Sequence, residues 1–311
     1  MLVTFWGVRG SIPTPGESTA RYGGNTPCVT IEHKDTLLII DCGSGLRVLG
    51  NALLQKSKGQ PIEADILISH THWDHIQGFP FFIPAFIPNN TFKIYGAEGV
   101  TLQIEETLAG QMESPYFPVT LDEMRASISF EHINEPEFTI GEFKVISTFL
   151  NHPGVALGYR ISTEEGEVVY YSDHEPYHRL LMTPSPFKLD VCSDISDDDK
   201  IQYAQIRDKE YVDFCKGADL LIEDSPYTAE EYKTKAGFGH ACVDDVITMA
   251  VEGQVKQVAL FHHDPIHTDE QIDQMVEYCQ TDLIPSDSTL QCIAAREGLQ
   301  ISIGQSVREA V

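Results

Sequence analysis

The segment 69–75, with the sequence SHTHWDH, constrains the fold of this chain most strongly. It follows an apolar triplet that predicts the end of a buried strand, and it packs three imidazoles and a carboxylate into six positions. Desolvated imidazoles need a partner for each ring nitrogen, and three together leave polar groups unpaired unless a cation collects them. In an extended segment His70 and His72 point the same way. If the chain then turns, Asp74 and His75 approach from the side and serve a second ion, so the segment predicts a dinuclear metal site.

The length and charge of the chain limit its architecture and partners. A chain of 311 residues can form one large α/β domain or two small ones. It contains no run of about 18 apolar residues, so we expect no membrane partner. The 21 lysines and arginines stand against 47 aspartates and glutamates, which gives a formal net charge of −26. Because such a charge repels polyanions, we do not expect a long nucleic acid as a partner.

The cysteines and the first residues indicate a cellular location. The seven cysteines form no CxxC pair, and several adjoin apolar runs, which is typical of buried, reduced thiols. The opening residues MLVTFW lack a basic segment followed by an apolar core, so no secretory signal is visible. We therefore expect a cytoplasmic protein.

Hydrophobic periodicity predicts two strand-rich halves, each followed by helices. The predicted strands are 2–8, 28–33, 37–41, 64–69, 92–95, 144–146, 168–171, 219–223 and 257–261, and the predicted helices are 45–57, about 100–111, one after His240 and one after Thr268. The acidic stretch 194–199 is predicted as a solvated loop or a helix start. The periodicity alone supports an α/β fold, and the grouping of the elements suggests a four-layer αββα sandwich.

Further candidate ligands lie where predicted strands end. His152, Asp173 and His262 each follow an apolar run directly, which is where rigid scaffolds present their chemistry. For each residue taken alone, a polar side chain that simply faces water explains the position equally well. Two adjacent divalent ions need about four ligands each, so residues beyond the first segment are required.

Together these motifs resemble the metallo-β-lactamase-fold hydrolases, and more closely the branch of tRNase Z and related phosphodiesterases. The HxHxDH signature of that family corresponds to His70, His72, Asp74 and His75, and the resemblance extends over nearly the whole chain. It implies an αββα sandwich, in a single domain over 1–311 with an insertion at about 84–130 and an acidic insertion at about 176–214.

The resemblance also implies a ligand set for two divalent ions. One ion would be held by His70, His72 and His152, and the other by Asp74, His75 and His262, with Asp173 bridging the two. Zinc suits a nitrogen-rich set best, with manganese or iron as alternatives.

A second motif concerns the substrate. Residues 237–245, GFGHACVDD, resemble the GHS/T motif of the tRNase Z-like group, with alanine in place of the hydroxyl residue. In that group the histidine approaches the scissile phosphate, which implies a catalytic role for His240. A histidine that merely precedes a helix is the alternative interpretation.

The remaining polar candidates carry less weight. His263 is either a contact near the site or structural, and Asp41 is a candidate for orienting a ligand histidine through its other ring nitrogen. His174, His178 and His267 have ordinary surface explanations, and His33 and His132 are better explained as structural or exposed. Arg9 and Asn25 could line the site, though structural roles in loops explain them at least as well.

The sequence thus predicts hydrolysis by a metal-activated water, most simply of a small or nucleotide-like phosphodiester. Asp74 would accept the proton of the water, and His240 would stabilise the phosphorane or protonate the leaving oxygen. The alternatives are a tRNA 3′-processing endonuclease, a carboxylic thioester or lactone hydrolase, and a non-catalytic di-iron sensor. The segment of about 84–130, which includes 112–119, could form a wall or lid over the pocket. Its aromatic and proline residues could equally make a dimer contact, so a homodimer stays open.

Overall fold

The computed structural model describes residues 1–97, 103–133, 135–184 and 195–304. The chain divides into two compact units, one formed by Met1–Ile146, Ser162–Gly166 and Ala295–Val311 and the other by Ser147–Ile161 and Glu167–Ala294. The single-domain organisation with two insertions stays a prediction.

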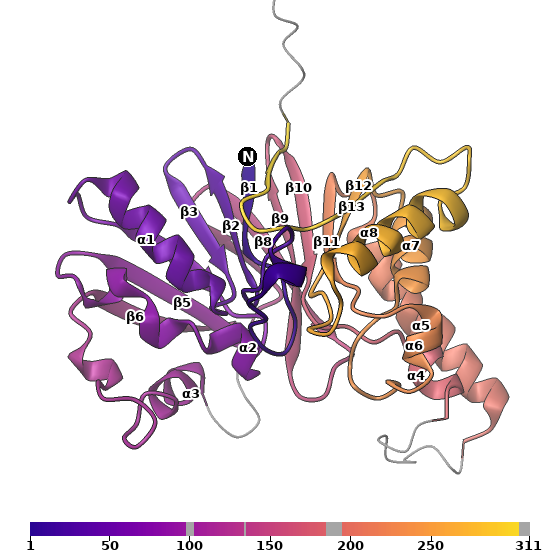
Figure 1. Cartoon of the computed structure of the whole chain (residues 1–311), viewed down its shortest axis with the longest axis horizontal. Helices are drawn as coiled ribbons and strands as arrows, with labels where there is room; N and C mark the ends of the chain where they lie inside the picture. The colour runs from indigo at the N-terminus through magenta and orange to yellow at the C-terminus, as the bar shows by residue number, and fades with distance from the viewer. Residues whose placement is uncertain (98–102, 134, 185–194, 305–311) are drawn as a thin grey trace, which may run out of the picture. The chain divides into compact units, whose positions relative to one another are not determined.

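The first unit contains a seven-stranded sheet (Figure 1). In sheet order its strands are β14 (Gln300–Ser302), β1 (Leu2–Gly7), β2 (Cys28–His33), β3 (Thr36–Ile40), β4 (Glu63–Leu67), β5 (Thr91–Ala97) and β6 (Ser127–Ile133). Neighbours from β14 to β3 are antiparallel, whereas β3 to β6 are parallel. The parallel strands β3 and β4 therefore end at the same edge of the sheet, which places Asp41 near the start of the histidine segment.

Helix α1 (Gly45–Ser57) covers this sheet, as the sequence predicted. Its leucines at 46, 49 and 53 are buried against Ile39 and Ile66 of the strands, which is the three-to-four-residue spacing of an amphipathic helix. The shorter helices of this unit are η1 (Glu17–Thr19), α2 (Trp73–Ile76), η2 (Phe79–Phe81), η3 (Ile83–Phe86), α3 (Ile104–Gly110) and η4 (Leu121–Glu123). The first residues of the predicted helix at about 100–111 lie outside the described residues.

A second seven-stranded sheet follows in the chain. Its order is β13 (Gln291–Ala294), β12 (Gln257–Phe261), β11 (Leu220–Asp224), β10 (Gly166–Tyr171), β9 (Ala156–Thr163), β8 (Phe143–Leu150) and β7 (Glu137–Ile140). Strands β10 to β13 are parallel, so β10, β11 and β12 present their carboxyl ends at one edge. This edge carries Asp173, Asp224 and His262.

The helices of the second unit are α4 (Tyr177–Met182), α5 (Asp197–Cys215), α6 (Ala229–Tyr232), α7 (Val243–Glu252), α8 (Asp269–Tyr278) and the π-helix η5 (Cys279–Leu283). The acidic stretch becomes the start of α5, where the Ser196 side chain accepts a hydrogen bond from the Asp199 amide. None of the helices in the described part of the chain is long and apolar enough to span a membrane.

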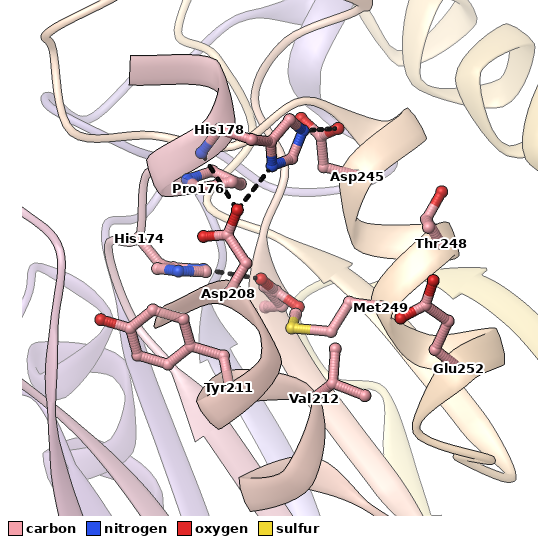
Figure 2. Close-up of a pocket in the computed structure, with 11 residues that line it drawn as sticks. His174, Pro176, His178, Asp208, Tyr211, Val212, Asp245, Thr248, Met249 and Glu252 are labelled. Carbon is pink, nitrogen blue, oxygen red and sulfur yellow. Dashed lines mark hydrogen bonds and ion pairs between the residues drawn. The ribbon is translucent and has the colours of Figure 1, made fainter. Parts of the chain in front are cut away.

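A charged clamp fixes α4 between α5 and α7 (Figure 2). His178 donates from Nδ1 to Asp208 Oδ2 at 2.8 Å and from Nε2 to Asp245 Oδ1 at 3.1 Å. Arg179 donates to the other oxygen of Asp245 at 2.8 Å. Burial lowers the pKa of His178, but its hydrogen bonds to the two carboxylates outweigh burial and raise that pKa to about 9.

The clamp makes the stability of the protein depend on pH. Because the pKa of His178 is raised above its ordinary value of 6.5, its contribution is fully present below pH 6.5 and is lost as the pH rises through about 9. The wild type should therefore have a higher free energy of unfolding than His178→Gln at pH 6.5, and this difference should decrease as the pH is raised to about 9. Urea denaturation of both proteins at several pH values measures this difference, and a difference that stays constant across the range contradicts the prediction.

Candidate metal centre

The histidine segment is positioned by the end of β4. The strand ends at Leu67, and His72 lies in extended conformation just before the single helical turn α2. The ring centroid of His70 lies 4.6 Å from that of His72 and 4.1 Å from that of His75. The turn of α2 brings Asp74 beside His75, with Oδ2 at 3.5 Å from Nε2. The predicted change from an extended segment to a turn is therefore present.

Asp41 orients two residues of this segment from the end of β3. Its Oδ2 accepts from His75 Nδ1 at 2.8 Å, and its carboxylate also accepts from the amide and hydroxyl of Ser69, both at 2.8 Å. Asp41 is fully buried and has a φ of 62°, in the left-handed region. With Nδ1–H directed at Asp41, the lone pair of the His75 ring lies on Nε2, the atom through which this side chain would bind a cation.

The turn after Asp41 fixes the position of α2. The Cys42 amide donates to the His75 carbonyl at 2.7 Å, and the Gly78 amide donates to the Cys42 carbonyl at 2.8 Å. A Cβ on Gly43 would lie 2.4 Å from the Asp74 carbonyl oxygen, so only glycine fits this close approach. The amide of Ser11 donates to Asp74 Oδ2 at 2.7 Å and holds the carboxylate of the segment.

The second unit brings together three residues from separate strand ends and loops. Asp173 follows β10, His262 follows β12, and His240 lies three residues before α7. One donor atom from each of these three lies within 4.8 Å of the others, which is a spacing that could hold a metal ion. His262 Nε2 is 3.4 Å from Asp173 Oδ1, and His262 has a φ of 56°, a strained value for a residue other than glycine. His240, predicted as catalytic, is thus placed as a possible ligand as well.

His152 joins the same cluster through a loop contact. Its Nδ1 donates to the Gly239 carbonyl at 2.8 Å, and its Nε2 lies 3.7 Å from Asp173 Oδ2. The side chain is almost fully buried. As for His75, the hydrogen bond at Nδ1 places the lone pair of the ring on Nε2, the atom that would bind a cation.

Gly239 is required beside His152, and its replacement should disturb the cluster. In Gly239→Ala, the new Cβ would lie 2.2 Å from His152 Nδ1 at a φ of 88°, so the imidazole must move. We expect loss of metal binding, measured as metal content after dialysis. Gly217→Ala is the matched control, because Gly217 has a φ of 71° but open space around its Cβ position. Equal metal content in the two variants would contradict the prediction.

Two acidic residues that the sequence reasoning missed support this cluster. Asp224, at the end of β11, accepts from His240 Nδ1 at 3.0 Å, and burial raises its pKa while that contact opposes the shift. Glu175 accepts from the amides of Gly237 and Gly239 at 2.7 and 3.0 Å. Asp224 could have been found, because it follows an apolar strand just as Asp173 and His262 do.

The other histidines have partners of their own. His33 is buried beside Glu164 and Glu165, and His267 lies 2.7 Å from Glu231. His174 and His267 are only 2% and 3% exposed, so the surface roles expected for them are wrong. His263 is buried next to His262.

Arg9 and Asn25 hold loops in the first unit. Arg9 is fully buried and donates from Nε to the Gly23 carbonyl at 2.9 Å. Asn25 donates from its side chain to Glu297 at 3.0 Å. Both contacts agree with the structural roles that the sequence favoured for these residues.

Comparison with known proteins agrees with this arrangement. Residues 36–185 match the model of the beta-lactamase superfamily domain. Ribonuclease Z of Thermoplasma acidophilum is 23% identical over 293 residues, which cover 87% of this chain and 88% of the relative. The metallo-beta-lactamase fold protein YhfI from Bacillus subtilis has a TM-score of 0.63 at 19% identity and covers 96% of this chain and 98% of its own. Human tRNase Z, short form, has a TM-score of 0.61 at 19% identity, and the match covers 97% of this chain and 99% of the human one.

These findings confirm the resemblance and the αββα fold class that the sequence predicted. The prediction of a hydrolase is confirmed at the level of the superfamily, since the relatives are hydrolases. The expectation that a long nucleic acid is not a partner is wrong, because relatives that match most of the chain are ribonucleases Z. The net charge of −26 is a sum over all residues, whereas bound divalent cations dominate the potential at a metal site.

Proposed function

We propose that this chain is a metal-dependent phosphodiesterase that cleaves nucleotide phosphodiester bonds at a dinuclear centre. Its ligands would be His70, His72, Asp74, His75, His152, Asp173 and His262, with Asp74 and His240 in catalytic roles. The observation that carries the proposal is the hydrogen bonding of the imidazoles. His75, His152 and His240 each engage Nδ1 with a protein acceptor, which directs Nε2 toward a different partner.

The donor set fits divalent cations of intermediate softness. Imidazole nitrogens and carboxylate oxygens together favour zinc, with manganese and iron as alternatives. Two bound ions would polarise a phosphoryl oxygen and lower the pKa of the attacking water. Buried carboxylates such as Asp173, at 2% exposed, are also expected where cations compensate their charge.

Asp74 is suited to accept the proton of the attacking water. The Ser11 amide occupies one lone pair of Oδ2 at 2.7 Å and fixes the carboxylate plane. The side chain belongs to α2 and is buried, with 6% of its surface exposed. A fixed carboxylate within reach of the water contributes as a general base.

His240 is suited to protonate the leaving oxygen. Its Nδ1 donates to Asp224, whose carboxylate stabilises the imidazolium form, and its Nε2 is left to hold the transferred proton. The surrounding glycine loop, fixed by Glu175, keeps the ring in place. Leaving-group protonation matters most for an alkoxide, as in the cleavage of RNA or of a nucleotide diester.

Cleavage of precursor tRNA at its 3′ side is the second candidate function. It is supported by the ribonuclease Z relatives, of which the Thermoplasma acidophilum protein matches 87% of the chain. A phosphodiesterase that also accepts small diesters and an RNA-processing enzyme share the same chemistry, so the substrate distinguishes them.

Three substrates test both candidates with the zinc- or manganese-loaded protein. They are bis-p-nitrophenyl phosphate, a precursor tRNA with a 3′ extension, and an acyl thioester. We expect turnover of a phosphodiester that is lost with a chelator and restored by added metal. Cleavage of the precursor at the 3′ extension supports the RNA-processing role. Thioester hydrolysis without diester hydrolysis overturns the proposal.

We also propose a cytoplasmic location and leave a homodimer as a possible assembly. Six cysteines of the described residues are free and buried, which supports a reducing environment.

A further inference from the structure

A cavity in the second unit is lined by residues outside the proposed ligand set. It has a volume of about 290 Å³ and is enclosed by α4, α5 and α7 above β11 (Figure 2). Its lining includes His174, Tyr211, Val212, Glu223, Met249 and Glu252. This volume is near the lower end of small-molecule sites. None of the proposed metal ligands is among the lining residues.

The floor of the cavity carries polar atoms that the fold leaves unsatisfied. His174 is 2% exposed and Glu223 is fully buried, and they contact each other through Nδ1 and Oε1 at 3.1 Å. The other atoms of the pair, His174 Nε2 and Glu223 Oε2, have no hydrogen-bond partner among the described residues. Buried polar atoms of native proteins are nearly always paired, so this pair indicates an external partner.

The floor of the cavity offers hydrogen-bond acceptors, so it favours a ligand that carries donors. When His174 donates from Nδ1 to Glu223, its Nε2 becomes an acceptor, as is Oε2 of the carboxylate. Two adjacent acceptors match a group that carries several N–H donors. Burial, followed by Asp224 and Asp245, raises the pKa of Glu223, and a cation on the floor would stabilise the carboxylate form of this side chain.

The walls of the cavity favour a ligand with an apolar body, and the charge of its lining favours a cation. Val212, Met249 and the ring of Tyr211 provide apolar contact surface. Of the described residues that line the cavity, none is a lysine or arginine, and four are carboxylic acids. Two of these, Asp208 and Asp245, are already paired with His178, which leaves Glu223 at the floor and Glu252 at the exposed mouth.

We propose that this cavity binds a small organic cation, with an ammonium or guanidinium group on the His174–Glu223 floor and a short apolar body against Val212 and Met249. The site is distinct from the metal centre and does not depend on the proposed hydrolysis. A neutral amide carries no positive charge to pair with Glu223, and an anion would face the carboxylates.

Calorimetric titration of the metal-loaded protein with butylammonium and butylguanidinium tests the proposal, with butyramide and butyrate as uncharged and anionic analogues. We expect saturable binding of the cations at one site and at least tenfold weaker binding of the analogues. Val212→Phe, which fills the cavity, should lower cation affinity at least tenfold, and so should the isosteric Glu223→Gln. Ile206→Phe adds bulk to the same helix at a position that is 54% exposed and should leave affinity unchanged.

Three results would overturn the proposal. They are the absence of saturable cation binding, equal affinity for butyrate, and unchanged affinity in the folded Glu223→Gln protein. Circular dichroism establishes whether each variant is folded. If Val212→Phe does not fold, the conservative variant Glu223→Gln still tests the proposal.

Discussion

Replacing His240 with glutamine is expected to lower kcat by about 10²–10⁴-fold for a diester with an alkoxide leaving group, the range typical of general acid catalysis. The loss should be much smaller for bis-p-nitrophenyl phosphate, because p-nitrophenolate leaves without protonation. This contrast follows from the position of His240, whose Nδ1 is engaged by Asp224 and whose Nε2 is left for the proton. Steady-state kinetics with both substrates at saturating metal measures it.

His267→Gln is the matched control, because His267 is also buried and paired with a carboxylate, Glu231, but lies outside the cluster. We expect it to leave the ratio of the two kcat values unchanged. Metal content is measured in parallel, since His240 also lies within ligand distance of Asp173 and His262. Equal losses on both substrates with one metal equivalent missing would assign His240 to the ligands and refute the acid role.

Replacing Asp41 with asparagine should weaken metal binding by about 10–100-fold, the usual effect of removing a carboxylate that orients a ligand histidine. The Asp41 carboxylate accepts from His75 Nδ1 and from Ser69, so an amide weakens the orientation of the imidazole. Asparagine tolerates the φ of 62° at this position, so the backbone should be preserved. Titration of the metal-free protein with zinc against a chromophoric chelator gives the affinity.

Activity of Asp41→Asn should return at excess zinc, because the ligands themselves remain. Asp65→Asn serves as control, since Asp65 lies on the adjacent strand β4 and binds Tyr95 rather than a histidine. A zinc affinity that is the same in Asp41→Asn and Asp65→Asn would show that Asp41 has no part in metal binding.

Much of the fold could be predicted because its strands and helices are marked by strong local patterns. The strand 28–33, the helix 45–57 and the strand 257–261 were predicted with the bounds that the structure has. Weakly marked elements were missed. β13 and β14 have four and three residues, which is too short for a periodic signal, and their positions are set by pairing with β12 and β1.

The candidate site was predictable to the extent that its residues follow strands. That rule selected Asp173 and His262, and it applies equally to Asp224, which was not selected. Glu175 could not be found in this way, because its role depends on loop amides 62 and 64 residues away in the chain. Contacts between loops have no period and leave no pattern in one sequence.

Net charge was the least reliable guide. A balance of −26 suggested that polyanions would be repelled, yet relatives of this chain are ribonucleases. Charge at a site is local, and within the second unit alone the carboxylates of Asp173 and Asp224 face imidazoles at 3.0–3.9 Å. Composition therefore limits solubility and long-range steering better than it limits substrate.

The pairing of β1 with β14 has a consequence for biosynthesis. β1 leaves the ribosome long before β14, the strand that covers its outer edge, which is made roughly 300 residues later. Until then, the hydrogen-bonding groups along that edge face solvent and could pair with another nascent chain. Shielding by a chaperone during translation would protect this edge, and a chain cut before Gln300 would keep it permanently open to aggregation.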